Sequence, residues 1–213
     1  NALEKISFMG KEGQTTGALT INVKDVNRDS SGEKTLKYEI RNKPQILKDE
    51  NLSPQFTVGK FSNLSGLRVN DIDSEELFVT LAVDQAKGGK ISLDSSSKAV
   101  VDVFTDESGA TIFGKSGDVN AVLSSLKFNP AINQTAGTIS VSVDDLDNLT
   151  EIVKEDIQIS NIQVAPPEIN VPSSKINVKA EKASKITGIE VADIDSNSVT
   201  LNISAPSGAF SGI

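Results

Sequence analysis

The stretch VNDIDSEELFVTL, from Val69 to Leu81, has a close counterpart in VADIDSNSVTLNI, from Val191 to Ile203. Each begins with an apolar residue that leads into Asp-Ile-Asp-Ser. Each continues with alternating apolar and polar residues, the pattern of a half-buried β-strand. The matching aspartates lie 122 positions apart: Asp71 and Asp193, and Asp73 and Asp195. Because recurrence at a fixed offset is typical of repeat architectures, we expect the chain to consist of repeated units.

A second recurrence links the beginning of the chain to its middle. Matching residues here lie 120 positions apart: Gly17 and Gly137, Leu19 and Ile139, Val23 and Val143, and Asp25 and Asp145. Together the two recurrences predict the C-terminal part of a first repeat (residues 1–43), one complete repeat (44–164) and the N-terminal part of a third (165–213). Prolines indicate short linkers at Asn42–Gln45 and Ala165–Glu168, because proline interrupts a strand and favours an extended connection.

The two partial repeats lead to a hypothesis about neighbouring molecules. Exposed edges of β-sheets accept additional strands from other chains. The partial repeats at the two ends could therefore complete each other between copies of the chain.

Short alternating segments separated by turn residues predict the strands. In the first unit, a strand over Leu19–Val23 is followed by an acidic loop, Asp25–Gly32, and a returning strand, Lys34–Ile40. In the complete repeat we expect strands at Gln55–Val58, Leu64–Val69, Leu77–Val83, Lys90–Leu93, Ala99–Phe104, Thr111–Phe113, Leu126–Phe128, Thr138–Val143 and Glu155–Ile159. Many short strands at regular spacing predict an all-β fold of the β-sandwich type.

The segment GDVNAVLSSL, Gly117–Leu126, is the one predicted helix. Asp118 is a candidate N-cap. The apolar residues that share one helical face are Val119, Val122, Leu123 and Leu126. Two interpretations stay open: a crossover turn that closes one end of the sandwich, or a helix that binds a partner.

Composition excludes several functional classes. The 213 residues include no Cys, His or Trp, which excludes thiolate chemistry, imidazole metal ligands and a Ser-His-Asp triad. Asp and Glu outnumber Lys and Arg by 29 to 21, and the resulting net charge of −8 disfavours nucleic acid and anionic membrane surfaces. No apolar run approaches the ~18 residues of a membrane span, so we expect no membrane insertion.

The order of the motifs resembles a known family. The segments that carry the resemblance are LSGLRV (Leu64–Val69), DIDS, LFVTLAV (Leu77–Val83), the Gly-Gly-x-Ile-x-Leu segment (Gly88–Leu93), DVNAVLSSLKFNP (Asp118–Pro130) and TISVSVDDLDN (Thr138–Asn148). In this order they resemble the cadherin-like, immunoglobulin-like tandem repeats of very large bacterial surface proteins and adhesins. The resemblance covers essentially the whole chain.

This resemblance implies an architecture and a role. It implies Greek-key β-sandwich repeats in tandem, with one short crossover helix per repeat, and a string of domains whose partners include its own neighbouring repeats. It also implies frequent calcium binding and a place outside the cell or on a bacterial cell surface, in adhesion or biofilm formation. One departure is that the linkers lack the Asp-x-Asn-Asp-Asn run of animal cadherins.

The acidic loops contain the candidate metal ligands. Calcium takes about six to eight oxygen ligands, mostly carboxylates and carbonyls. Asp71 and Asp73 lie in one loop, and a later loop contributes Asp144, Asp145 and Asp147. In an immunoglobulin-like sandwich these loops share one end, so we expect them to converge on the linker Asn42–Gln45. The equivalents in the partial units are Asp193 and Asp195 for the first loop, and Asp25, Asn27 and Asp29 for the second.

A simpler interpretation of the same residues is that they form turns, with their side chains in solvent. Recurrence of both loops at matching positions favours the calcium hypothesis. A calcium ion at the N-terminal end of each repeat would tie the two loops together and stiffen the joint with the preceding domain.

Three functions follow as alternatives. The leading one is a spacer and adhesion module, with host or cell-surface glycans or proteins as candidate partners. The second is a carbohydrate-binding module, although sugar-binding faces usually carry aromatic rings and this chain has one Tyr and eight Phe. The third is an enzyme using Asp144 and Asp145. Adjacent residues at a strand end point to opposite faces, so we do not expect an enzyme.

Overall fold

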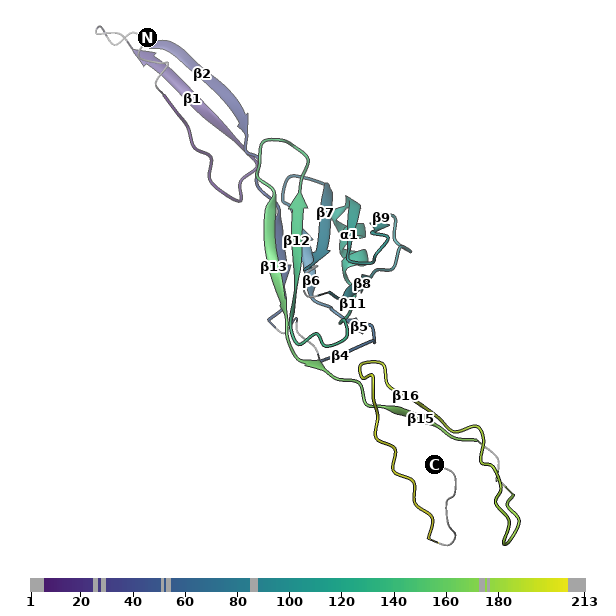
Figure 1. The fold of residues 1–213 in the computed structure, drawn as a ribbon. Helices are drawn as coiled ribbons and strands as arrows, with labels where there is room; N and C mark the ends of the chain where they lie inside the picture. The colour runs from purple at the N-terminus through teal and green to yellow at the C-terminus, as the bar shows by residue number, and fades with distance from the viewer. Residues whose placement is uncertain are drawn as a thin grey trace.

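The computed structural model describes residues 6–24, 27, 30–50, 52, 55–84, 88–172, 175 and 177–206. Across these residues the chain is mostly β, with predominantly antiparallel strand pairs and one short helix, α1 (Ser116–Leu123). Figure 1 shows an elongated molecule, with a hairpin at the N-terminal end, a body in the middle and extended C-terminal segments at the opposite end. The helix of this described part is too short to cross a membrane.

A five-stranded antiparallel sheet forms one side of the central body. Its order is β13 (Val153–Ile159), β12 (Gly137–Asp144), β7 (Glu76–Val83), β10 (Gly109–Lys115) and β9 (Val100–Val103). Apolar residues alternate along β7 and β12, so every second side chain is buried. The alternating patterns predicted these central strands to within one or two residues.

Smaller strand pairs surround this sheet. They are β3 (Gln45–Lys48) with β6 (Leu67–Asn70), the set β5 (Ser62–Asn63), β11 (Lys127–Asn129) and β8 (Lys90–Ser92), and β4 (Phe56–Thr57) with β14 (Ile162–Gln163). The last pair is parallel, with the backbone N–H of Val58 donating to the carbonyl of Gln163 at 3.0 Å. Buried side chains of the central body form a hydrophobic cluster that includes the edge-to-face rings of Phe56 and Phe128, 5.4 Å apart.

Helix α1 closes one side of this cluster. Val119, Val122 and Leu123 are buried, so its apolar face packs on the core and is not exposed for a partner. The prediction of Asp118 as N-cap was wrong, because Lys115 occupies that position without a side-chain hydrogen bond and Asp118 lies in the first turn. A negative charge in that turn still suits the helix dipole. Leu126, predicted inside the helix, lies beyond its end but is buried.

The two ends of the chain are less compact. At the N-terminal end, β1 (Thr16–Lys24) pairs with β2 (Ser30–Glu39) in an antiparallel hairpin, so β2 begins inside the predicted acidic loop. At the other end, β15 (Glu168–Asn170) pairs with β16 (Glu190–Ala192). Because Gln45 and Glu168 already begin strands, both linkers end one residue earlier than predicted.

One predicted strand is absent from the described part of the chain. The sequence VTLNI, at 199–203, alternates like β7, but it forms no strand there. Its counterpart β7 lies between β12 and β10 and exchanges hydrogen bonds with both. Among the described residues no neighbouring strand pairs with 199–203. An alternating pattern favours a strand, but a partner is needed to satisfy its backbone groups.

Candidate functional site

The Asp-Ile-Asp-Ser loop lies between β6 and β7. Asp71 Oδ1 accepts hydrogen bonds from the backbone N–H groups of Asp73, at 2.9 Å, and Ser74, at 3.0 Å. Asp193 Oδ1 accepts the equivalent bond from the N–H of Asp195, at 3.1 Å. One oxygen of each leading aspartate is therefore a turn former, as the simpler interpretation proposes. The other oxygen of Asp71, Oδ2, is buried and has no hydrogen-bond partner.

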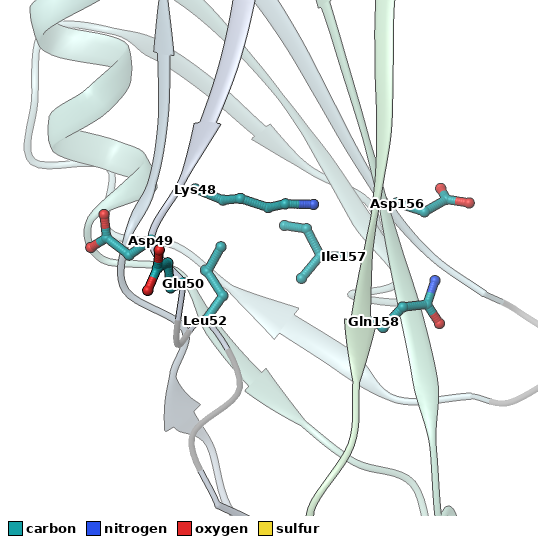
Figure 2. A pocket seen from close by; sticks show the side chains of 7 residues that line it. All are labelled: Lys48, Asp49, Glu50, Leu52, Asp156, Ile157 and Gln158. Carbon is teal, nitrogen blue, oxygen red and sulfur yellow. The ribbon is translucent and has the colours of Figure 1, made fainter.

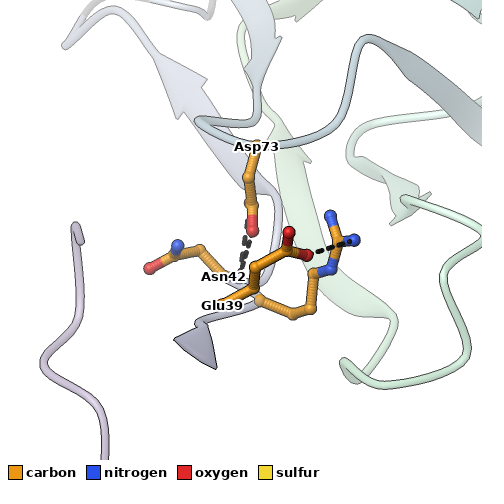
Figure 3. Close-up of polar contacts among 4 residues, drawn as sticks. Glu39, Asn42 and Asp73 are labelled. Carbon is orange, nitrogen blue, oxygen red and sulfur yellow. Dashed lines mark hydrogen bonds and ion pairs between the residues drawn. The ribbon is translucent and has the colours of Figure 1, made fainter. Parts of the chain in front are cut away.

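The second aspartate of this loop binds the linker. The backbone N–H of Asn42 donates to Asp73 Oδ2 at 3.0 Å and to Oδ1 at 3.3 Å (Figure 3). At the other joint, the backbone N–H of Ala165 donates to Asp195 Oδ2. The sequence-predicted residues Asp73 and Asp195 thus occupy the same position, each facing the amide of a residue that shortly precedes a strand.

Asn42 connects the first unit to this loop. While its backbone binds Asp73, its side-chain Oδ1 accepts a hydrogen bond from Gly13 N–H at 2.9 Å, and its Nδ2 donates to the carbonyl of Gln14 at 3.1 Å. Sequence analysis placed Asn42 only in a linker. Its partners Gly13 and Gln14 contribute backbone atoms, which no residue pattern reveals. Ala165, at the second joint, has no side-chain amide to make these bonds.

The second acidic loop follows β12. Asp145 is buried, and its Oδ2 accepts a hydrogen bond from the Thr150 hydroxyl at 2.7 Å. Asp147 Oδ1 accepts from the N–H groups of Leu149, at 2.7 Å, and Thr150, at 3.1 Å, while its Oδ2 is buried without a partner. Asp144 Oδ1 accepts from the N–H of Leu146 at 2.8 Å. This loop also uses its aspartates as turn formers and leaves one buried oxygen unpaired.

The electrostatics of the two loops differ in sign. Burial raises the pKa of Asp71 above its ordinary value, and the neighbouring Asp73 carboxylate adds to the increase against the opposing effect of two backbone hydrogen bonds. Burial alone would raise the pKa of Asp147, but hydrogen bonds from Leu149 and Thr150 and the positive charge of Arg41 outweigh it and lower the pKa overall. The charged form of the Asp71 carboxyl is therefore disfavoured in the folded protein.

Both loops lie at the linker end of the five-stranded sheet. Asp144 faces Phe78 near the beginning of β7, so the loop after β12 and the loop before β7 share one end. A surface pocket of about 330 Å³ lies beside them, lined by Gly10, Glu12, Ile40, Arg41, Asn42, Lys43, Thr150 and Glu151. Asn42 of the linker thus contacts the first loop, and Arg41, which directly precedes the linker, lies near the second.

The structure does not gather all the predicted ligands into one cluster. Asp71 accepts the backbone N–H of Asp73, and Asp145 accepts that of Asp147, but no three acidic side chains among the described residues form a group that could hold a metal ion. Asn27 lies in an exposed turn, and Asp25 and Asp29 lie outside the described residues. Two unpaired buried oxygens, Asp71 Oδ2 and Asp147 Oδ2, still match the preference of a hard cation for carboxylate oxygen.

A second surface pocket shows no comparable chemistry. It measures about 430 Å³ and lies between the β3 end and β13 (Figure 2). Its lining has mixed charge and no aromatic ring: Lys48, Asp49, Glu50, Leu52, Asp156, Ile157 and Gln158. Lys48 is bound in an ion pair with Glu155. The pocket offers no aromatic platform on which a sugar ring could stack.

Comparison with known protein families found none that matches the chain, and comparison with curated proteins found no significant match.

Proposed function

We propose that the chain is a structural spacer and adhesion module of a large bacterial surface protein, built from tandem β-sandwich repeats whose joints are stiffened by calcium. The observation that carries the proposal is the shared contact at the joints. In each, an Asp-Ile-Asp-Ser loop accepts the backbone N–H of a linker residue, Asn42 for Asp73 and Ala165 for Asp195. Such a contact fixes how one unit follows the next.

Matching strand pairs support the repeat. β3 pairs with β6 so that Ile46 faces Val69, and β15 pairs with β16 so that Ile169 faces Val191. Ile46 and Ile169 lie 123 positions apart, and Val69 and Val191 lie 122 positions apart. The second offset is the one that separates the matching aspartates. The hairpins β1–β2 and β12–β13 also correspond, since both join two long antiparallel strands: Gly17 lies opposite Tyr38 and Gly137 opposite Ile159, offsets of 120 on the first strand and 121 on the second.

Calcium at the joint is supported by the chemistry of the two loops. Asp71 Oδ2 and Asp147 Oδ2 are buried without hydrogen-bond partners. A bound cation would supply the positive charge that balances these carboxylates. Asp73 and Asp145 lie beside them and would complete the carboxylate set. Arg41 stands near Asp147 at this joint, whereas Val164 precedes Ala165 at the other. The positive charge of Arg41 opposes a cation at the first joint.

The test is calcium titration of the whole chain by calorimetry, with thermal melting in calcium and in chelator. We expect binding heat and a higher melting temperature in calcium, both reduced by Asp71→Asn and by Asp147→Asn. Asp94 provides the matched control, because it forms the same kind of turn with Ser96 away from the joint, and Asp94→Asn should bind as the unmodified chain does. Absence of both heat and melting shift would end the calcium proposal.

A further inference from the structure

The isoleucine of the Asp-Ile-Asp-Ser loop is exposed in both of its copies. Ile72 is 56% exposed, and Ile194, 122 positions later, is 53% exposed. The aspartates on either side form turns and bind linker amides, and the isoleucine takes no part in these hydrogen bonds. A large apolar side chain gains stability by leaving water, so a contact with another surface would stabilise it. At the second joint the structure shows that surface.

Ile194 lies against a turn of the central body. The turn spans residues 57–60, and the N–H of Lys60 donates to the carbonyl of Thr57 at 3.1 Å. A Cβ added to Gly59 would overlap Cδ1 of Ile194 and lie 3.0 Å from its Cγ1. The Ile194 side chain therefore touches the backbone of Gly59. Figure 1 shows the loop after β16 directed toward β4, across the linker that joins the two units.

This turn is firmly attached to the central body. The N–H of Val58 donates to the carbonyl of Gln163 in β14 at 3.0 Å, and the N–H of Gly59 donates to the carbonyl of Pro130 at 3.4 Å. Gly59 has a φ of +75°, in the left-handed region that favours glycine. Glycine at this position therefore serves the turn and also leaves room for Ile194.

The loop after β16 thus holds the joint at two points. Asp195 accepts the N–H of Ala165 in the linker, and Ile194 contacts the central body itself. Pro166 and Pro167 fix two φ angles of the linker, but their ψ angles can still rotate. A bond to the linker alone moves with the linker. A second contact on the body fixes the angle between the two units.

The contact is local. A pocket of about 360 Å³ lies beside it, with Val58 and Lys60 of the turn, Pro166 of the linker and Ala192 of β16 in its lining. The two units are therefore separated by open space next to Ile194. Loss of this one side chain should release the loop from the turn.

We propose that Ile194 sets the angle between the central body and the unit that follows it, through an apolar contact with the Gly59 turn that does not require calcium. This inference rests on the proposed function, in which units follow one another in tandem. The contact involves no charged group, so neither chelator nor salt at moderate concentration should disrupt it. Calcium would then stiffen a joint whose angle is already set.

Distance measurement by pulsed electron paramagnetic resonance, on the full chain in chelator, tests the contact. The chain has no cysteine, so spin labels attach only at the introduced Lys127→Cys in β11 and Glu190→Cys in β16, both exposed positions. We expect one dominant distance when no other residue is changed. Ile194→Ala removes three carbon atoms from a half-covered side chain and should lower the population of this distance, relative to all others, by about 5- to 10-fold.

Ile72→Ala is the matched control, because it makes the same change in the same loop motif at the other joint. It should leave the measured distance unchanged. An Ile194→Ala chain with the original distribution, or equal broadening by Ile72→Ala, would overturn the proposal. So would a broad distribution in the unmodified joint that narrows only when calcium is added. Absence of calcium binding in calorimetry would instead end the calcium proposal alone, since these distances are measured in chelator.

A double-mutant cycle separates the contact from the conformation of the turn. Gly59→Ala strains the turn because φ is +75°, whichever residue occupies position 194. With Ile194 present, the added Cβ should also displace the loop and shift the dominant distance. In the Ile194→Ala background the overlapping atoms are gone, so Gly59→Ala should cause no further change in the distribution. An equal shift in both backgrounds would refute the contact.

Discussion

The side chain of Asn120 in helix α1 is a sensitive test of how the central body is held together. Its Oδ1 accepts the backbone N–H of Val69 at 2.8 Å, and its Nδ2 donates to the carbonyl of the same residue at 2.8 Å. Val69 is buried in β6 and pairs with Ile46 on the neighbouring strand β3. The amide of Asn120 thus takes the place that another strand would occupy beside β6.

Replacing Asn120 by Ala removes both bonds. Each hydrogen bond contributes about 0.5–1.5 kcal/mol. The N–H and C=O of Val69 would also be left unpaired beside the core, so the combined loss should lie near the upper end of the sum of the two bonds. We expect Asn120→Ala to lower the free energy of unfolding of the central body by about 2–3 kcal/mol. Urea unfolding followed by circular dichroism measures this loss.

Asn129→Ala is the matched control for this experiment. Asn129 Oδ1 is buried without a hydrogen-bond partner, so the same substitution there should cost less than about 1 kcal/mol. If both variants unfold at the same urea concentration as the unmodified chain, the amide of Asn120 does not hold β6. Equal, large losses would instead show that any Asn→Ala change in this body is destabilising, and would refute the specific role of the Val69 contact.

Four further predictions concern other parts of the body. Gln134→Ala should cost about 2–3 kcal/mol in urea unfolding, since this buried amide accepts a hydrogen bond from Ala131 and donates to two carbonyls. Gly89→Ala should cost about 1–3 kcal/mol in the same assay, because φ is +102° and the added Cβ would lie 2.7 Å from the Phe128 ring. Without calcium, Asp71→Asn should raise the melting temperature at pH 7 and leave it unchanged below the ordinary pKa of 3.8, because a raised folded pKa makes ionisation destabilising. Asp147→Asn should lower it at pH 7, since its folded pKa is lowered and its ionised form stabilises the fold above the ordinary pKa; shifts of the same sign in both variants would contradict this electrostatic account.

Side-chain alternation predicted the central strands because burial on one face determines which residues a strand can carry. The segments β7 and β12 alternate over eight residues each and were predicted within one or two positions. The pattern failed at 199–203, where the residues are suitable but no described strand lies alongside. Strand formation depends on a partner, which a local pattern does not contain.

The candidate site was predictable in its residues and less so in its contacts. Recurrence identified Asp73 and Asp195, and both bind a linker amide. The roles of Asn42 and Asn120 were missed, because each side chain binds backbone atoms of distant residues. Backbone partners are the same for every residue type, so the sequence carries no signal for them.

The parallel pairing of β4 with β14 has a mechanical consequence. β14 is the last strand before the second linker, and β4 is anchored by Phe56 in the core. Tension applied along the chain would pull β14 lengthwise past β4, across the hydrogen bonds that join them. Bonds loaded in this shearing direction share the force and break together, whereas a strand peeled from its end loses them one at a time. The connection from β14 to the second linker should therefore resist stretching.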